Sequence, residues 1–208
     1  LDPTNLDCLI GKARLLILRE RYEEAVATAQ TAVAQHPENA SARAVLAQAL
    51  DWQGDTQAAF EQALQAVEVD DANAYAFAVL AEVQADRGNM AGAMRAAQRS
   101  LELDRQSAMA HRNMGYALEH QGLYVQALQE YEKAAQLEPS VFLYYLNMGY
   151  TYMAMQDLDQ AISKFAIAAE KDPHSAMALD ALGWTHLLAG DIEQAIPILK
   201  QATEADPK

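Results

Sequence analysis

Residues 108–139 read AMAHRNMGYALEHQGLYVQALQEYEKAAQLEP. Gly122 interrupts this stretch near its middle and Pro139 closes it, which leaves a segment of helical length on either side of the glycine. Gly115 in the first segment and Ala127 in the second are small residues flanked by larger apolar ones. Because two helices cross closely only where the side chains at the contact are small, the stretch predicts a pair of packed helices.

The same punctuation recurs along the chain with a period of 34 residues. The anchors that close successive units are Pro3, Pro37, Asp71, Arg105, Pro139, Pro173 and Pro207. Two places after the first six anchors stand Asn5, Asn39, Asn73, Ser107, Val141 and Ser175. All but Val141 are good helix N-caps, so a helix is predicted to start afresh in every period. The repeats then begin at Leu6, Ala40, Ala74, Ala108, Phe142 and Ala176. We expect residues 1–5 to end a preceding repeat and residues 6–208 to form a single array.

Three positions of the repeat carry small residues in every unit. The eighth residue is Ala13, Ala47, Ala81, Gly115, Gly149 or Gly183, and the twentieth is Ala25, Ala59, Ala93, Ala127, Ala161 or Ala195. The twenty-seventh is Ala32, Ala66, Ser100, Ala134, Ala168 or Ala202. The twenty-fourth residue grows from Ala29, Ala63 and Ala97 to Tyr131, Phe165 and Leu199, which predicts larger cores in the later repeats.

This pattern resembles the tetratricopeptide repeat family from Leu6 to Pro207. The resemblance implies an all-α fold, a right-handed superhelical solenoid of antiparallel helix pairs. It also implies that the first helix of each pair lines a concave groove and that the second forms the outer wall. The chain departs from the family pattern at Lys12, His186 and Pro197, and Pro197 is expected to remove one backbone hydrogen bond from its helix.

Composition excludes several classes of partner. The formal charge of -14 opposes the electrostatic attraction that drives binding to nucleic acids and to anionic membranes. The longest apolar run, residues 74–81, is too short to cross a bilayer, so no membrane insertion is predicted. Cys8 has no second cysteine to pair with. The chain opens on Leu1 without a signal-like segment, so we expect a piece of a longer protein, and the cytoplasm is weakly favoured as its compartment.

No pattern of catalytic residues accompanies the repeats. The five histidines fall at unrelated repeat positions and have no metal-ligand spacing. No glycine-rich phosphate loop follows a strand pattern, and no nucleophile has a supporting motif. We therefore expect no enzymatic activity, no metal and no cofactor.

One stripe of each first helix is left over once the packing positions are assigned, and the family resemblance places it in the groove. In the first three repeats this stripe is mixed and acidic, and it includes Asp51, Trp52, Glu82 and Asp86. In the last three repeats it is aromatic and rich in sulfur. The predicted peptide-binding residues are Met109, Arg112, Asn113, Tyr116, Leu143, Leu146, Asn147, Tyr150, Met153, Met177, Asp180 and Trp184. The alternative is that these residues complete the packing between repeats.

Asn113 and Asn147 occupy the sixth position of consecutive repeats. The pair resembles the asparagine ladder with which a member of the family holds the backbone of an extended peptide, because one amide can donate to and accept from a peptide unit. The alternative is a local role in capping backbone groups. The lysine and asparagine set that other members use to clamp a carboxylate is missing from this sequence.

The leading hypothesis is a protein-protein interaction module that binds an extended peptide in the groove of repeats 4 to 6. The alternative is a structural spacer or self-association domain that positions an enzyme or regulator encoded elsewhere in the full-length chain. Self-association would use the last helix, where Ile192, Ala195, Ile196, Leu199 and Ala202 form an apolar stripe. An RNA-processing scaffold is a more distant alternative, against the acidic charge.

Overall fold

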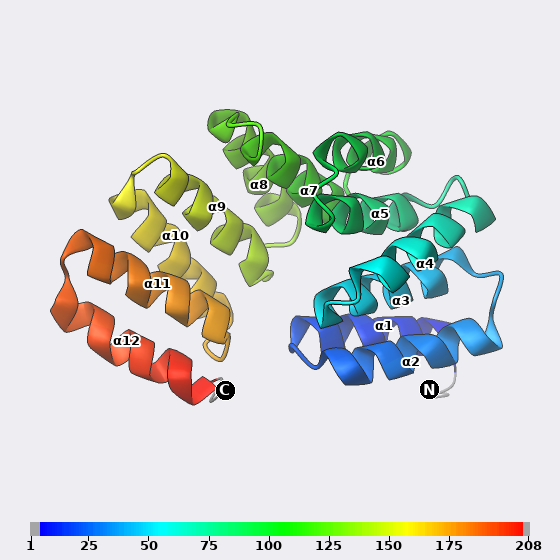
Figure 1. The fold of residues 1–208 in the computed structure, drawn as a ribbon, viewed down its shortest axis with the longest axis horizontal. Helices are drawn as coiled ribbons and strands as arrows, with labels where there is room; N and C mark the ends of the chain where they lie inside the picture. Colours follow the sequence, from blue (N-terminus) through cyan, green and yellow to red (C-terminus); the bar gives the residue numbers. More distant parts are fainter. Residues whose placement is uncertain (1–4, 206–208) are drawn as a thin grey trace. The chain divides into compact units, whose positions relative to one another are not determined.

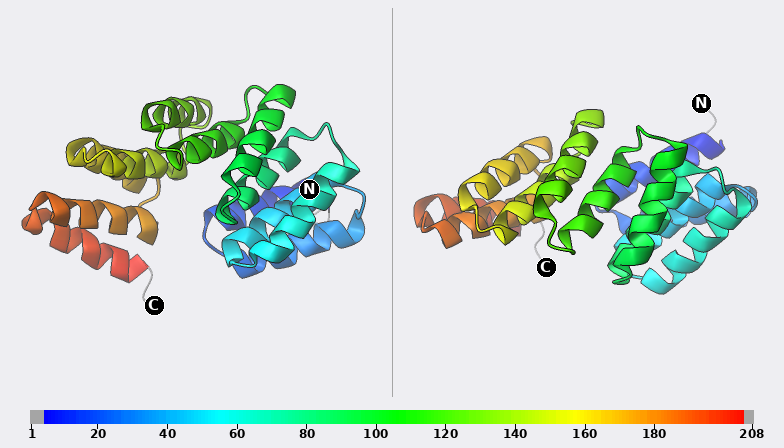
Figure 2. Two further views of the ribbon diagram at one scale, coloured as in Figure 1. Left: turned by 45° about the horizontal axis from the view of Figure 1, so that its top comes forward. Right: turned by 90° about the horizontal axis from the view of Figure 1, so that it is seen from above.

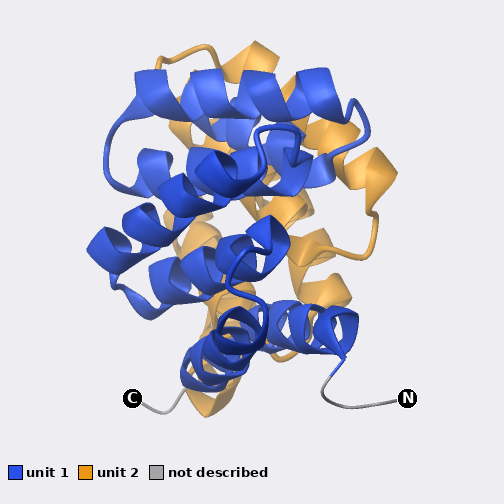
Figure 3. Cartoon of the chain, turned by 90° about the vertical axis from the view of Figure 1, so that its right-hand side faces the viewer, with its two compact units in different colours: residues 1–117 blue, residues 118–208 orange. Residues whose placement is uncertain are grey.

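The computed structural model describes residues 5–205, and within that range it contains twelve α-helices and no strand (Figure 1). The chain divides into two compact units, residues 1–117 and residues 118–208 (Figure 3). The helices of the first unit are α1 (Leu6–Leu18), α2 (Tyr22–Gln35), α3 (Ala40–Gln53), α4 (Thr56–Val69), α5 (Ala74–Asp86), α6 (Met90–Leu103) and α7 (Ala108–Glu119), whose last two residues belong to the second unit. The second unit continues with α8 (Tyr124–Leu137), α9 (Phe142–Ala154), α10 (Leu158–Lys171), α11 (Ala176–Ala189) and α12 (Ile192–Ala205).

Every predicted repeat start coincides with the start of an odd-numbered helix. Asn39 and Asn73 cap α3 and α5 by accepting a hydrogen bond over 2.9 Å from the backbone N–H three residues on. Ser175 caps α11 in the same way, over 3.3 Å. Val141 forms no such bond at α9, as its side chain requires. Helix caps therefore lie at the predicted positions in these repeats. The anchors Pro3 and Pro207 lie outside the described residues.

Within each unit the helices pair in sequence and run antiparallel (Figure 2). In the first unit α1, α3 and α5 contact one another in turn, and each also packs on the even-numbered helix that follows it. In the second unit α9 contacts α10 and α11, and α11 contacts α12. We call the odd-numbered helices first helices and the even-numbered ones second helices. The fold is an all-α helical repeat, as predicted.

The small residues lie at the helix crossings. All the alanines of the eighth and twentieth positions have 0% exposure, from Ala13 to Ala195. In the second unit Gly149 faces the ring of Phe165, where an added Cβ would overlap the ring, and Phe165 itself is fully buried. The larger cores predicted for the later repeats are therefore present, and glycine makes room for them.

The turns inside the repeats need a left-handed backbone. Gly54 ends α3 with φ of 98° and Gly190 ends α11 with φ of 87°, a region that glycine enters without steric cost. Two repeats lack a glycine there, and Glu20 and Gln156 adopt φ of 58° and 64° instead. The helix pair thus forms in all repeats, with some backbone strain where a side chain replaces glycine.

Candidate functional site

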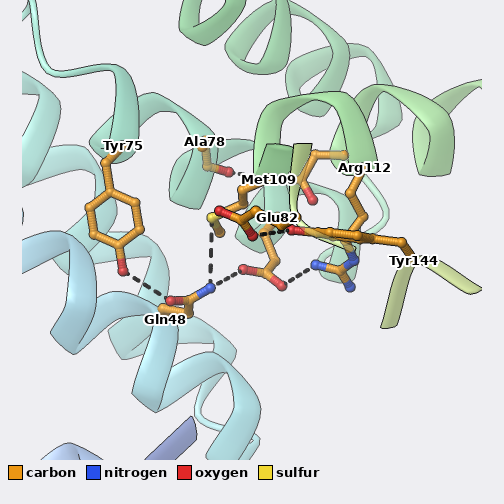
Figure 4. Close-up of polar contacts among 9 residues, drawn as sticks. Gln48, Tyr75, Ala78, Glu82, Met109, Arg112 and Tyr144 are labelled. Carbon is orange, nitrogen blue, oxygen red and sulfur yellow. Dashed lines mark hydrogen bonds and ion pairs between the residues drawn. The ribbon is translucent and has the colours of Figure 1, made fainter. Parts of the chain in front are cut away.

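A chain of polar contacts crosses the first helices of the first unit (Figure 4). Tyr75 Oη on α5 donates to Gln48 Oε1 on α3 over 2.9 Å. Gln48 Nε2 in turn donates to Glu82 Oε2 over 2.9 Å, and Arg112 Nη1 on α7 donates to Glu82 Oε1 over 2.6 Å. Glu82 is only 4% exposed, so the ion pair is largely shielded from water. We call Gln48, Tyr75, Glu82 and Arg112 the polar chain of the first unit, since hydrogen bonds join each member to the next.

Aromatic rings contact the guanidinium of Arg112 in this polar chain and that of Arg14 beside it. The guanidinium of Arg112 lies over the ring of Trp52 at 5.9 Å, and Trp52 stacks on Tyr22 at 6.0 Å. The guanidinium of Arg14 lies over Tyr75 at 5.1 Å. Burial raises the pKa of Tyr75 above its usual range, with an opposing effect of Arg14, so its hydroxyl stays a donor. The face thus combines carboxylate, guanidinium and ring, all supplied by the chain itself.

Asp51 lies beside this polar chain, buried, and neither of its carboxylate oxygens receives a hydrogen bond from a described residue. Burial raises the pKa of Asp51 to about 8, and the carboxylates of Asp86 and Glu82 add to the rise while Arg112 opposes it. At neutral pH the carboxyl is therefore mostly protonated, and its proton can be shared with Asp86. This explains how three carboxylates can lie together on one face with a single arginine.

The first helices of the second unit present a different surface. Tyr150 on α9 is 42% exposed and Trp184 on α11 is 55% exposed, and Met177 on α11 is exposed as well. The ring of Tyr150 is anchored at its edge by Phe165, at a centroid distance of 5.1 Å and an interplanar angle of 71°. Burial also raises the pKa of Tyr150, with a smaller contribution from Asp180. The ring of Tyr150 is therefore held in place by Phe165 while part of its surface faces solvent.

Thr185 Oγ1 donates to the backbone oxygen of Ala181 over 2.6 Å and lies 3.5 Å from the sulfur of Met153, so Met153 contacts α11. We call Tyr150, Met177, Asp180 and Trp184 the open face of the second unit. All four are exposed. The contrast with the polar chain of the first unit is that this surface is apolar, aromatic and uncovered.

Two of the predicted site residues lie in the interior. Asn113 is 2% exposed, and its Nδ2 donates to the backbone oxygen of Ala78 over 2.7 Å, so its amide joins α7 to α5. Leu146 is 2% exposed and belongs to the apolar core around Phe165. Both positions border the packing stripe, and the neighbouring helix covers them. A partner cannot reach either residue without displacing a helix, which corrects their placement on the binding surface.

The other predicted residues divide between the two units. Met109, Arg112 and Tyr116 belong to the first unit, each half-buried. In the second unit the half-buried residues are Leu143, Asn147 and Met153, and the exposed ones are Tyr150, Met177, Asp180 and Trp184. The asparagine ladder keeps one accessible member, Asn147, and stays a prediction for that residue.

Sequence reasoning missed the polar chain, although the sequence carries a signal for it. Gln48 and Glu82 are 34 residues apart and both occupy the ninth position of their repeats. A hydrogen-bonding pair at equal positions of adjacent repeats is the repeat-protein counterpart of a pair one turn apart on a helix.

In the described part of the chain, no helix is long and apolar enough to cross a membrane.

Three family models described as tetratricopeptide repeat match the chain. They cover residues 1–49 and 16–59, residues 108–141, and residues 140–208. No curated protein sequence matches it.

Solved structures share the fold at low sequence identity. The crystal structure of the APC/C hetero-tetramer Cut9-Hcn1 matches with a TM-score of 0.79 and 16% identity, over 100% of this chain and 41% of that chain. A human IFIT1 dimer with m7Gppp-AAAA matches with a TM-score of 0.81 and 20% identity, over 95% of this chain and 50% of that one. YrrB, described as a TPR protein with an unusual peptide-binding site, matches with a TM-score of 0.53 and 21% identity, over 86% and 93%. This chain thus spans half or less of the first two proteins.

Proposed function

The chain belongs to the tetratricopeptide repeat family, and from this premise we propose that it is a protein-binding module that takes up an extended polypeptide segment. The first helices of the second unit, α9 and α11, supply the contact surface. The observation that carries the proposal is the open face, where large rings lie exposed on α9 and α11. On the first helices of the first unit, by contrast, the polar chain forms internal hydrogen bonds. Exposed apolar surface of this kind is typical of interaction sites.

The physical properties of the open face suit a polypeptide ligand. Tyr150 and Trp184 offer large apolar rings with a polar atom each, and rings of these two types dominate binding energy at protein interfaces. Met177 adds a flexible and polarisable contact. Because Phe165 already holds the ring of Tyr150, less side-chain freedom is lost on binding. Met109, Arg112 and Tyr116 of repeat 4 belong to the first unit, so they stay predictions from the sequence and are not part of this surface.

The similar structures support this choice of ligand class in part. YrrB is described as having a peptide-binding site, whereas the IFIT1 structure contains a capped RNA fragment. For this chain the formal charge of -14 argues against RNA, since phosphate binding depends on clustered lysine and arginine. A polypeptide is therefore proposed and RNA is left as an outcome of the test.

A displayed library of random peptides tests the proposal, because such a library needs no identified partner. The immobilised chain selects binders from the library, and a labelled form of each selected peptide is then titrated by fluorescence anisotropy. Truncating an aromatic anchor at an interface costs about 2 kcal/mol, so Tyr150→Ala should weaken binding roughly thirtyfold. Trp184→Ala should act in the same direction.

The matched control is Val125→Ala on α8, a residue that is 62% exposed and lies outside the open face. Affinity should stay within about twofold of the wild type in this variant. Selected peptides that bind the Tyr150→Ala, Trp184→Ala double variant as tightly as the wild type would refute the proposal. Selection of RNA but not peptides from parallel libraries would replace the polypeptide by a nucleic acid.

Self-association is a second candidate, favoured by the exposure of Ile192 at 58% and Ile196 at 48% on α12. The remaining residues of the predicted stripe turn inward, because Ala195 and Ala202 are buried and Leu199 lies against Gly183. The apolar surface is therefore smaller than the sequence indicated. Light scattering at rising protein concentration and ionic strength tests it, since salt screens the repulsion between chains and leaves apolar contact intact. A mass that rises in the wild type but not in Ile196→Glu supports the candidate, and a monomer throughout excludes it.

A further inference from the structure

Asp180 is the only acidic or basic residue, histidine aside, on the two first helices α9 and α11. The second unit contains no arginine, and the lysines on its helices are Lys133, Lys164, Lys171 and Lys200. All four lie on α8, α10 or α12, which are second helices. The open face therefore carries one negative charge and no positive charge of its own.

The carboxylate of Asp180 is exposed, and no described residue forms a hydrogen bond or an ion pair with it. Its surroundings are aromatic and apolar. Trp184 follows one helical turn later on α11 and Met177 precedes it by one turn, so the three side chains share a face of the helix. Asp180 is also close enough to Tyr150 on α9 to affect its ionisation.

The first unit contains a carboxylate, a guanidinium and a ring in contact at equivalent repeat positions, with the arginine standing where the second unit has its carboxylate. Arg112 is the fifth residue of α7 and Glu82 is the ninth residue of α5, the preceding first helix. Asp180 and Tyr150 occupy the same two positions in α11 and α9. In the first unit the arginine bonds the carboxylate over 2.6 Å and lies over the ring of Trp52. The second unit provides the carboxylate and the rings but no guanidinium.

We propose that the open face reads an arginine side chain of the bound polypeptide, whose guanidinium pairs with Asp180 and stacks on the rings of Tyr150 and Trp184. This inference rests on the proposed function, because it names the residue type that the binding module selects. A planar guanidinium can bond a carboxylate and lie flat on an aromatic ring at the same time, whereas the compact ammonium of lysine does this less well. One carboxylate is too few for a metal ion, which needs several oxygen ligands.

An array of synthetic octapeptides tests the inference. Within each set the peptides share the same apolar and aromatic residues and differ at one position only. That position is arginine, lysine, citrulline or glutamate. Citrulline keeps the size and planarity of arginine and removes its charge. The wild-type chain should bind the arginine peptides about tenfold more tightly than the citrulline peptides. In Asp180→Asn this ratio should fall close to one, with the affinity for the citrulline peptides unchanged.

Asp159→Asn on α10 is the matched control, since Asp159 is an exposed acidic residue on a second helix. It should keep the tenfold ratio. A ratio that is equally high in the wild type and in Asp180→Asn would overturn the inference, and so would a wild-type preference for lysine over arginine. Binding of the arginine peptides that persists when Tyr150 and Trp184 are both replaced by alanine would instead overturn the proposed function.

Discussion

The first helices of the two units carry different side chains on equivalent stripes: internal polar contacts in the first unit and exposed rings in the second. In the first unit one stripe of the first helices is filled by the polar chain, in which Glu82 accepts hydrogen bonds from Gln48 and Arg112, and Arg112 also lies over a ring. In the second unit the equivalent stripe carries exposed rings around Asp180. The surface side chains of a repeat can therefore bond to the adjacent repeat or stay exposed to a partner. They bond to the adjacent repeat where it carries a complementary hydrogen-bonding or charged group.

The largest effect is expected from breaking the polar chain at its centre. Glu82→Ala removes the acceptor of both Gln48 and Arg112, and it leaves the guanidinium of Arg112, whose side chain is only 15% exposed, without its carboxylate. Breaking such a buried pair from one side costs about 3 to 5 kcal/mol of unfolding free energy. Urea unfolding in a Trp184→Phe background reports on the first unit, because Trp52 is then the only tryptophan.

Glu24→Ala is the control for this experiment, because the Arg21–Glu24 pair is more than half exposed on both sides. Its loss should cost no more than about 0.5 kcal/mol. Equal losses in the two variants would show that the polar chain does not stabilise the first unit. The double variant Glu82→Leu, Arg112→Met should recover much of the loss, since it removes both charges.

An intermediate effect is expected from Gly149→Ala, which tests whether the open face depends on the packing beneath it. The new methyl group would overlap the buried ring of Phe165, the ring that supports Tyr150. Overpacking of this kind costs about 2 kcal/mol. Unfolding of the second unit can be followed through Trp184 in a Trp52→Phe background.

Gly11→Ala provides the comparison, because nothing lies within 4 Å of the position of its Cβ. There the alanine should stabilise α1 by up to about 1 kcal/mol through its higher helix propensity. A gain in stability from Gly149→Ala as well would mean that Phe165 can move aside freely.

The smallest effect concerns pH, to which the first unit should respond through Asp51. Its pKa is about 8 in the folded state and near 3.8 when exposed, so between these values the folded state holds the extra proton. The stabilisation from protonating Asp51 is complete below about pH 4 and is lost as the pH rises through about 8. Asp51→Asn keeps the shape without the charge, so it should raise the stability of the first unit at pH 9.

The measurement is the urea midpoint of the Trp52 signal between pH 6 and pH 9, with and without Asp51→Asn, both in the Trp184→Phe background. The midpoint should fall more steeply over this range when Asp51 is present than when asparagine replaces it. Parallel curves would show that Asp51 is already ionised at pH 6. The Trp184 signal of the second unit, read in the Trp52→Phe background, serves as the reference.

Most of the fold was predictable because its determinants are local and repeat. Caps such as Asn39 and Ser175 bond backbone groups three residues away, and the crossing residues are small in every repeat. The site was only partly predictable, because exposure at the fifth and sixth positions depends on the neighbouring helix. Asn113 is buried where α7 meets α5, and its amide donates to the backbone oxygen of Ala78 there. The pKa of Asp51 similarly depends on carboxylates that two different helices bring together.

The match between Gly149 and Phe165 also bears on how such a chain can change through recombination. In the first unit the same two positions hold alanines, such as Ala47 and Ala63, both fully buried. Changing only one residue of such a pair toward the other pair creates either a steric clash or a cavity, so the two positions are coupled in their effect on stability. A first helix carried into a foreign repeat without its second helix would inherit the wrong volume. The helix pair, and not the single helix, is therefore the smallest cassette that can be shuffled among these repeats.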